Sequence, residues 1–147
     1  MNLIIDPIKN YLPDFNKKIY DTTDAIEFCR KHKILTVETD LIDDLGEYRI
    51  HRGVPTILIH PLVKPEEKSW VFNHEIAHFC LHPTTMAKFS DEVTKRKIEM
   101  EANCVAAIML MPKFIIENKT LAEIQDEFGY PLKIILIRKW IADEQKI

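Results

Sequence analysis

The chain has 147 residues, 46% of them hydrophobic, so it is long enough for one globular domain with a buried core and too apolar for a disordered chain. Its 20 lysines and arginines against 23 aspartates and glutamates give a net charge of −3, which provides no general attraction to nucleic acid or to an anionic membrane. Three cysteines without CxxC spacing argue against a disulfide framework. The unpaired cysteines, the lack of a leader pattern and the lack of a long apolar run together predict a cytoplasmic protein.

The first 60 residues predict one helix followed by a small sheet. Apolar residues on one side predict a helix over 24–33, and a run rich in β-branched residues predicts a strand over 34–39. Two further strands are expected near 46–51 and 55–60, on either side of a glycine turn. Because proline has no N–H to give to a neighbouring strand, Pro55 suits the start of its strand or an edge strand.

The remainder of the chain is predicted to be helical. One long helix is expected over 65–81, because proline is favoured at the first helical position and a second proline follows the end. A second long helix is expected over 91–111. A short helix begins at the capping residue Thr120 and ends at Gly129, and a last helix with a dense apolar face is expected over 132–143.

A helix, a small sheet and then several helices are typical of an α+β fold. We expect a single domain over residues 1–147, with a functional core over 24–116 and a helix pair over 117–147 packed on it. The pair has the outline of a helix-turn-helix. Its acidic residues outnumber its basic ones, however, and the isoleucines of its last helix belong in a core or a partner interface. We therefore expect no direct contact with nucleic acid.

The motif that indicates chemistry is His74-Glu75-Ile76-Ala77-His78, an HExxH sequence inside the first long helix. Residues four apart lie on one face of a helix, so the two imidazoles can bind one metal ion. Zinc accepts imidazole nitrogens, and Glu75, about 100° further around the helix, can reach a water bound to the metal as a general base. The spacing therefore predicts Zn²⁺ as the cofactor and hydrolysis as the reaction.

A catalytic zinc also needs a third protein ligand. The extended HExxHxxGxxH pattern is not met, because Leu81 and Thr84 stand where the glycine and the third histidine would be. The candidates are Glu99 and Glu101 on the second long helix, which lie about 200° apart around the helix and cannot both face one metal. We expect Glu101 to be the ligand, because its face includes apolar residues that should point inward, and Glu99 is the alternative.

Other polar side chains are candidates for the neighbourhood of the metal. His82 follows His78 by four residues, so it is a candidate for orienting a ligand or for donating to the oxyanion. A histidine favoured by the negative end of the helix dipole is the other interpretation. Cys80 and Cys104 are interpreted as small buried residues rather than as zinc ligands. Three side chains of the sheet region are candidates for a cleft wall, although a structural or exposed role is favoured for each: His51, His60 and Tyr48.

These motifs together resemble the ImmA/IrrE family of zinc metallopeptidases. That family typically reads as an apolar strand, then HELGHxxLH, then ExEANxFAxxLLMP. This chain has the apolar strand at 57–59, HEIAHFCLH at 74–82 and EMEANCVAAIMLMP at 99–112. The final segment, 121–138, is similar to the helix pair that follows the peptidase motifs in the family. The resemblance covers about residues 24–140, with motif, order and spacing in agreement.

The resemblance implies a gluzincin-like fold, in which a small three-stranded sheet packs against a zincin-type helical core with additional C-terminal helices. It implies His74, His78 and a helix glutamate as zinc ligands, and limited proteolysis of a protein substrate, a DNA-binding regulator of a mobile element or stress response. Three positions depart from the family pattern without removing a ligand: Asn73, Ala77 and Val105. The alternative is a zinc-containing module that regulates a transcription factor or toxin–antitoxin partner by contact alone. The intact motif favours the enzyme, because a pure binder has no need of Glu75.

Overall fold

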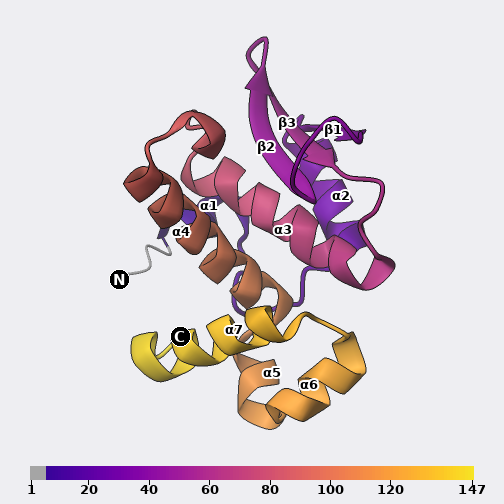
Figure 1. Ribbon diagram of the computed structural model, residues 1–147. Coiled ribbons are helices and arrows are strands. Elements are labelled where there is room, and N and C mark those ends of the chain that lie inside the picture. The colour runs from indigo at the N-terminus through magenta and orange to yellow at the C-terminus, as the bar shows by residue number, and fades with distance from the viewer. Residues whose placement is uncertain (1–5) are drawn as a thin grey trace.

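The computed structural model describes residues 6–147, which contain seven α-helices, one short 3-10 helix and three strands (Figure 1). Residues 1–5, part of the segment in which no leader pattern is expected, lie outside the described residues. The predicted elements are present with ends within two residues, and two short helices, α1 and α5, are added to them. The elements are α1 (Asp6–Tyr11), α2 (Thr22–Lys31), β1 (Leu35–Glu38), β2 (Gly46–His51), β3 (Val54–Ile59), α3 (Pro65–Leu81), η1 (Ala87–Phe89), α4 (Glu92–Leu110), α5 (Lys113–Asn118), α6 (Leu121–Phe128) and α7 (Leu132–Gln145).

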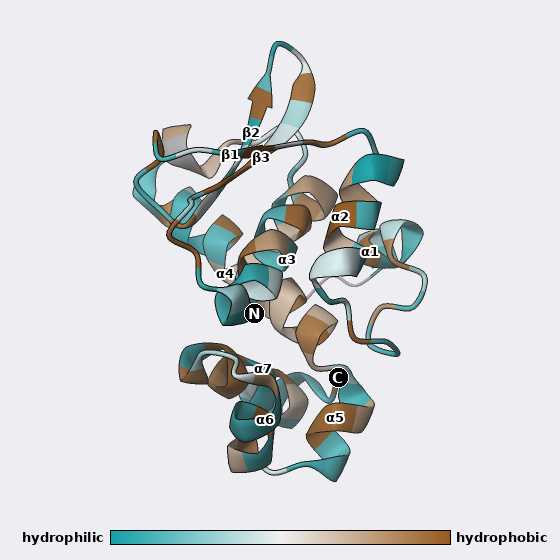
Figure 2. Cartoon of the chain, turned by 90° about the vertical axis from the view of Figure 1, so that its right-hand side faces the viewer, coloured by the Kyte–Doolittle hydropathy of each residue, from teal (hydrophilic) through white to brown (hydrophobic). Residues whose placement is uncertain are grey.

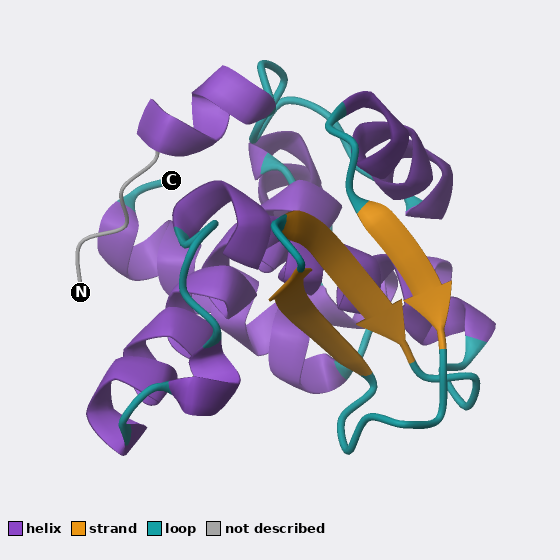
Figure 3. Cartoon of the chain, turned by 90° about the horizontal axis from the view of Figure 1, so that it is seen from above, coloured by secondary structure: helices purple, strands orange, loops and turns teal. Residues whose placement is uncertain are grey.

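The three strands form a mixed sheet in the order β1-β3-β2, with β1 parallel and β2 antiparallel to β3 (Figure 3). Pro55 is the second residue of β3, so its predicted place near a strand start is confirmed, whereas an edge position is wrong because β3 is central. Pairing between β1 and β3 begins at Leu35 and Thr56. Pro55 therefore precedes the parallel pairing and need not donate an N–H to β1.

Helices α3 and α4 pack against each other at the centre of the molecule (Figure 1). The sheet contacts α3, while α5, α6 and α7 lie together at the opposite end of the molecule (Figure 2). From Ala102 to Leu110 almost every residue of α4 is buried, because α3 and α7 both pack on it. The predicted α+β class with a small three-stranded sheet is thereby confirmed. None of the helices within residues 6–147 combines the length and the apolar composition needed to cross a bilayer.

Two buried polar side chains join distant segments to this core. Asn73 of α3 donates from Nδ2 to the carbonyl oxygen of Tyr20 at 2.9 Å. Arg138 of α7 donates from Nε to the carbonyl oxygen of Met111 at 2.5 Å and from Nη2 to Asn16 Oδ1 at 3.2 Å. A buried polar group left without its partner costs about 1–3 kcal/mol. These bonds therefore hold the segment before α2, and α7, against the central helices.

The C-terminal helices follow their local signals at the ends but not on their surfaces. Thr120 and Glu123 form a capping box at the start of α6, and Gly129 ends the helix in the left-handed conformation at φ 69°. The prediction of one dense apolar face on the last helix is partly wrong. Ile134 of α7 is buried, but Trp140, assigned to the same face, is 41% exposed. α7 therefore carries apolar residues on two sides.

Candidate metal centre

Helix α3 presents His74 and His78 one turn apart, with both imidazoles directed at the same point. Their Nε2 atoms lie 3.2 Å apart, and the rings meet edge to face with centroids separated by 4.8 Å. Both side chains are largely buried. This arrangement follows from the helix itself, because a separation of four residues places two side chains on one face.

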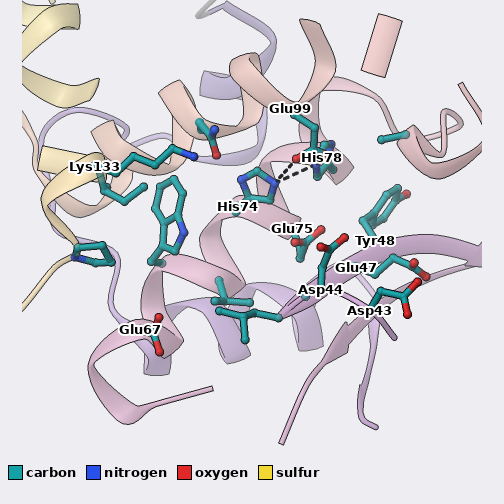
Figure 4. Close-up of a pocket in the computed structure, with 18 of the residues that line it drawn as sticks. Asp43, Asp44, Glu47, Tyr48, Glu67, His74, Glu75, His78, Glu99 and Lys133 are labelled. Carbon is teal, nitrogen blue, oxygen red and sulfur yellow. Dashed lines mark hydrogen bonds and ion pairs between the residues drawn. The ribbon is translucent and has the colours of Figure 1, made fainter. Parts of the chain in front are cut away.

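Glu99 of α4 completes the group (Figure 4). Its Oε2 lies 2.9 Å from His74 Nε2, and its Oε1 lies 3.1 Å from His78 Nε2. Glu101 faces elsewhere, and its Oε2 lies 3.8 Å from His82 Nε2. The expectation that Glu101 is the glutamate facing the two histidines is therefore wrong, and the alternative residue occupies that position.

The reason lies in the burial of α4. The prediction used apolar neighbours such as Cys104 and Ile108 to identify an inward face, and both are fully buried. Because α4 is covered by more than one element, however, buried neighbours do not show which carboxylate meets the histidines. Glu99 shares its side of the helix with Asn103, four residues later, and both line the cleft described below. The predicted divergence of the two glutamates is present.

Glu75 lies beside the two imidazoles and is 5% exposed. The potential ligand atoms of His74, Glu75 and His78 all lie within 4.8 Å of one another. Opposite Glu75 is Gly46, the first residue of β2. A Cβ at this position would lie 2.6 Å from Val71 Cγ1 and 3.0 Å from Glu75 Oε2, so only glycine allows β2 to approach α3 this closely. Sequence reasoning missed Gly46; its one signal was a glycine at the start of a predicted strand.

Burial and neighbouring charges shift the pKa values of this group in different directions. Burial opposes the ionisation of Glu99, but hydrogen bonds from His74 and His78 outweigh it and hold the pKa of Glu99 well below its usual range. Burial also opposes the charged form of His74, yet the carboxylates of Glu75 and Glu99 outweigh it and raise the pKa of His74. At Glu75 burial dominates, and its pKa is raised although both histidines act to lower it.

The donor set fits a divalent metal ion. Two imidazole nitrogens and one carboxylate are ligands that zinc takes in catalytic sites, with bonds of about 2.0–2.2 Å. Donor atoms at the corners of a tetrahedron of that size lie about 3.3 Å apart. The separations among His74 Nε2, His78 Nε2 and the Glu99 carboxylate are 2.9, 3.1 and 3.2 Å. One cation would therefore bind all three side chains in place of the hydrogen bonds among them.

This group lines a cleft of about 690 Å³, a size typical of ligand sites. Asp43, Asp44 and Glu47 lie on one side of the cleft, and Lys133 of α7 lies on the opposite side, where it extends toward His74 (Figure 4). The Glu99 side chain is 39% exposed. The group is thus open to solvent, as in a catalytic metal site, whereas structural zinc sites are closed by four protein ligands.

The other predicted neighbours take separate positions. Tyr48 lines the cleft, and its hydroxyl donates to the carbonyl oxygen of Pro83 at 2.7 Å, which joins β2 to the end of α3. His82 is the C-terminal cap of α3 and lies beside Glu101, outside the cleft lining. Both predicted core cysteines are buried free thiols, as expected. Four candidates lie outside the cleft lining: His51, His60, Cys80 and Cys104.

An α+β fold with an HExxH helix, a glutamate of the next long helix facing it and an open cleft beside both defines a metallopeptidase-like protein. The chain belongs to the M78 peptidase family, because the family model described as an IrrE N-terminal-like domain matches residues 29–138. The resemblance to ImmA/IrrE metallopeptidases carried by the sequence motifs is thereby confirmed.

Two other proteins are similar to this chain, one in sequence and one in structure. Uncharacterized immunity region protein 2 of Bacillus phage phi105 is 28% identical over 105 residues, which are 69% of this chain and 66% of the phage protein. The structure of a Mycobacterium tuberculosis transcriptional regulator superposes with a TM-score of 0.64 at 15% sequence identity, over 95% of this chain and 47% of that chain. The chain thus spans about two thirds of the phage protein and about half of the mycobacterial one. The second likeness supports the fold.

Proposed function

We propose that the protein is a zinc-dependent endopeptidase that performs limited proteolysis of a protein substrate. The observation that carries the proposal is the convergence of His74, His78 and Glu99 within 3.2 Å of one another, in an open cleft that also contains Glu75. Two histidines and one glutamate form the ligand set of several zinc peptidases, in which the fourth position is left to water or substrate. His74, His78 and Glu99 would hold the ion.

Zinc in this site would supply a Lewis acid that polarises the scissile carbonyl and makes water a nucleophile near neutral pH. The protein supplies the proton transfer. Glu75 is placed to accept a proton from water at a carboxylate oxygen and to return it to the leaving amine. Strand β2 approaches that carboxylate closely at Gly46, where an added Cβ would lie 3.0 Å from Glu75 Oε2.

Strand β2 is the element best placed to bind the substrate backbone. In the sheet formed by the described residues, β3 is its one neighbour, so β2 is an edge strand. Gly46, Glu47 and Tyr48 of this strand line the cleft next to the metal ligands. An extended peptide can add to such an edge by backbone hydrogen bonds. The scissile bond would then pass beside Glu75.

The substrate that we propose is a DNA-binding regulator of a mobile element or stress response. Two observations support it: the ImmA/IrrE resemblance and the immunity-region name of the phage relative. The balanced charge of the chain favours a protein over DNA as its direct partner, and we propose no nucleic-acid contact.

The test compares wild-type protein with Glu75→Gln, His74→Ala and a control, Glu66→Gln, whose carboxylate is exposed on the same helix outside the cleft lining. Bound metal is measured by elemental analysis, and cleavage by mass spectrometry of DNA-binding regulators encoded beside the gene. We expect Glu75→Gln to retain zinc and to cleave about 10²–10⁴-fold more slowly. We expect His74→Ala to lose zinc, and Glu66→Gln to match the wild type. Equal cleavage by wild type and Glu75→Gln contradicts the proposal.

A further inference from the structure

A second groove lies between α4 and α7, next to the cleft. Its volume is about 680 Å³, and its lining is apolar except for one lysine. Four of its large apolar side chains are 41–50% exposed, which is unusual for so many neighbouring residues of this kind. Contiguous exposed apolar surface of this type marks interaction sites on soluble proteins. The groove is lined by Met100 of α4 and by Leu132, Lys133, Leu136, Ile137 and Trp140 of α7.

The groove exists because α7 has two apolar sides. One side is buried in the core and includes Ile134 and Ile141. The other follows Leu132, Leu136 and Trp140, which are four residues apart and therefore lie in one row along the helix. A helix needs one apolar side to pack on its own domain. The second row has no such role in the part of the chain that the structure describes.

Lys133 connects the groove to the cleft. It lines both of them, and its neighbour Ile134 also lines the cleft. In Figure 4 its side chain extends from α7 toward His74. Within residues 6–147 it forms no ion pair with a carboxylate. A chain segment lying in the groove would therefore meet an unneutralised cation at the entrance to the metal centre.

We propose that the groove docks an amphipathic helix of the protein substrate, an inference that rests on the proposed function. The helix places apolar side chains at i, i+3 or i+4 and i+7 against the row Leu132, Leu136 and Trp140. At the end nearest the cleft it carries a carboxylate that pairs with Lys133. Because docking and cleavage sites are contiguous, the docked helix holds the segment to be cut at a high local concentration beside β2.

The dimensions of the groove favour a helix over other occupants. A stable dimer of this chain would bury about 800 Å² on each copy over about 20–30 residues, whereas six residues line the groove. A site for a small ligand also has a few placed polar groups that fix the orientation of the ligand, whereas this groove has one polar side chain, Lys133. One face of a helix offers three or four apolar anchors in a line, which matches the row on α7.

Binding is tested with the fluorescence of the two tryptophans. Trp70 lines the cleft and Trp140 lines the groove, so in Trp70→Phe protein the emission reports on the groove alone. The probe is a synthetic amphipathic peptide of about 18 residues, long enough to form a helix, with leucines along one face and glutamates at one end. We expect a saturable change in emission. Adding Leu136→Lys weakens binding at least about tenfold, whereas Phe114→Lys, at a 47% exposed site on α5, leaves it unchanged.

Charge is tested by exchanging signs on both partners. A peptide with lysines in place of its glutamates should bind about threefold to tenfold more weakly, and Lys133→Glu should reverse that preference. Absence of a saturable Trp140 signal overturns the proposal, as does equal binding by Leu136→Lys. Dimerisation of the wild type in analytical ultracentrifugation that Leu136→Lys abolishes would assign the groove to a second copy, and would overturn it too.

The link to the substrate is tested on an intact regulator that the protein cleaves. Leu136→Lys should lower kcat/KM for the intact regulator about tenfold or more, but leave cleavage of a short peptide spanning the cut bond unchanged. Equal effects on both substrates, or no effect on either, would overturn substrate docking. If wild-type protein cleaves neither, the proposed function fails by itself, and the peptide titration separately decides whether the groove binds a helix.

Discussion

Glu99 and Glu101 are two residues apart on one helix, yet only Glu99 meets the two imidazoles, so metal affinity distinguishes them directly. Glu99→Gln keeps the size of the side chain and removes a negative charge from a group whose oxygens lie 2.9 and 3.1 Å from His74 and His78 Nε2. Glu101→Gln makes the same chemical change at a carboxylate whose neighbour is His82, at 3.8 Å. The two variants are therefore a matched pair.

The expected magnitudes follow from these contacts. Removing a residue that only orients a metal ligand costs about 10–100-fold in affinity. Removing a ligand should cost more, so we expect Glu99→Gln to weaken zinc binding by more than about 100-fold, which corresponds to about 2.7 kcal/mol. Glu101 touches neither imidazole of the proposed ligand pair. Glu101→Gln should therefore weaken binding less than about tenfold.

The assay is a competition titration of metal-free protein with zinc and a chromophoric chelator of known affinity. Circular dichroism and thermal unfolding of each metal-free variant establish that the fold is retained. A larger loss of affinity in Glu101→Gln than in Glu99→Gln would refute the assignment of Glu99. Equal losses would show that burial around α4, rather than direct ligation, governs affinity.

Three further predictions concern a close contact, a buried hydrogen bond and a buried thiol. Gly46→Ala places a Cβ 2.6 Å from Val71 Cγ1, about 0.9 Å inside an ordinary contact. The substitution should lower the free energy of unfolding by about 1–3 kcal/mol. If adding Val71→Ala restores none of this loss, the proposed clash is contradicted. Arg138→Met leaves the Met111 carbonyl without its donor and should cost about 2–4 kcal/mol in urea denaturation, whereas an unchanged midpoint refutes it. Burial raises the pKa of Cys29 to about 12. At pH 8, Cys29 of the native protein should therefore be alkylated at least about 100-fold more slowly than Cys29 of the unfolded protein. Similar alkylation rates in mass spectrometry would disprove this protection.

The elements that the sequence predicts best carry their boundary signals locally. Helix α3 begins at Pro65, and α6 begins after Thr120 and ends at Gly129, as expected. Each signal acts through the backbone of its own few residues, so no tertiary information is required. Helices α1 and α5 have six residues each, too few for a periodic apolar pattern to appear. They are held by packing on the core instead, through buried residues such as Ile8 and Ile115.

The residues of the site likewise fall into those that the sequence could predict and those that it could not. His74 and His78 face one another because they are one turn apart, which the sequence contains. Glu99 faces them because of how α4 crosses α3, and Gly46 is required because of how closely β2 approaches α3. Neither relation is encoded in the periodicity of one element. Residues of the site on one helix were therefore predictable, whereas the choice between two glutamates on another helix was not.

The two glutamates beside the imidazoles, Glu75 and Glu99, therefore have separable proposed roles, and this separates an enzyme from a module that binds zinc without cutting. Glu99 contacts both imidazoles and is 39% exposed, whereas Glu75 is 5% exposed and lies against Gly46. In an enzyme, Glu99→Gln should lose metal and cleavage together, while Glu75→Gln should lose cleavage alone. In a non-cleaving module, burying a carboxylate beside an open metal site would cost free energy without a return in function. Glu75→Gln would then leave the regulatory effect unchanged, whereas in an enzyme it abolishes cleavage and the regulatory effect that depends on cleavage, so the two readouts measured side by side tell the two apart.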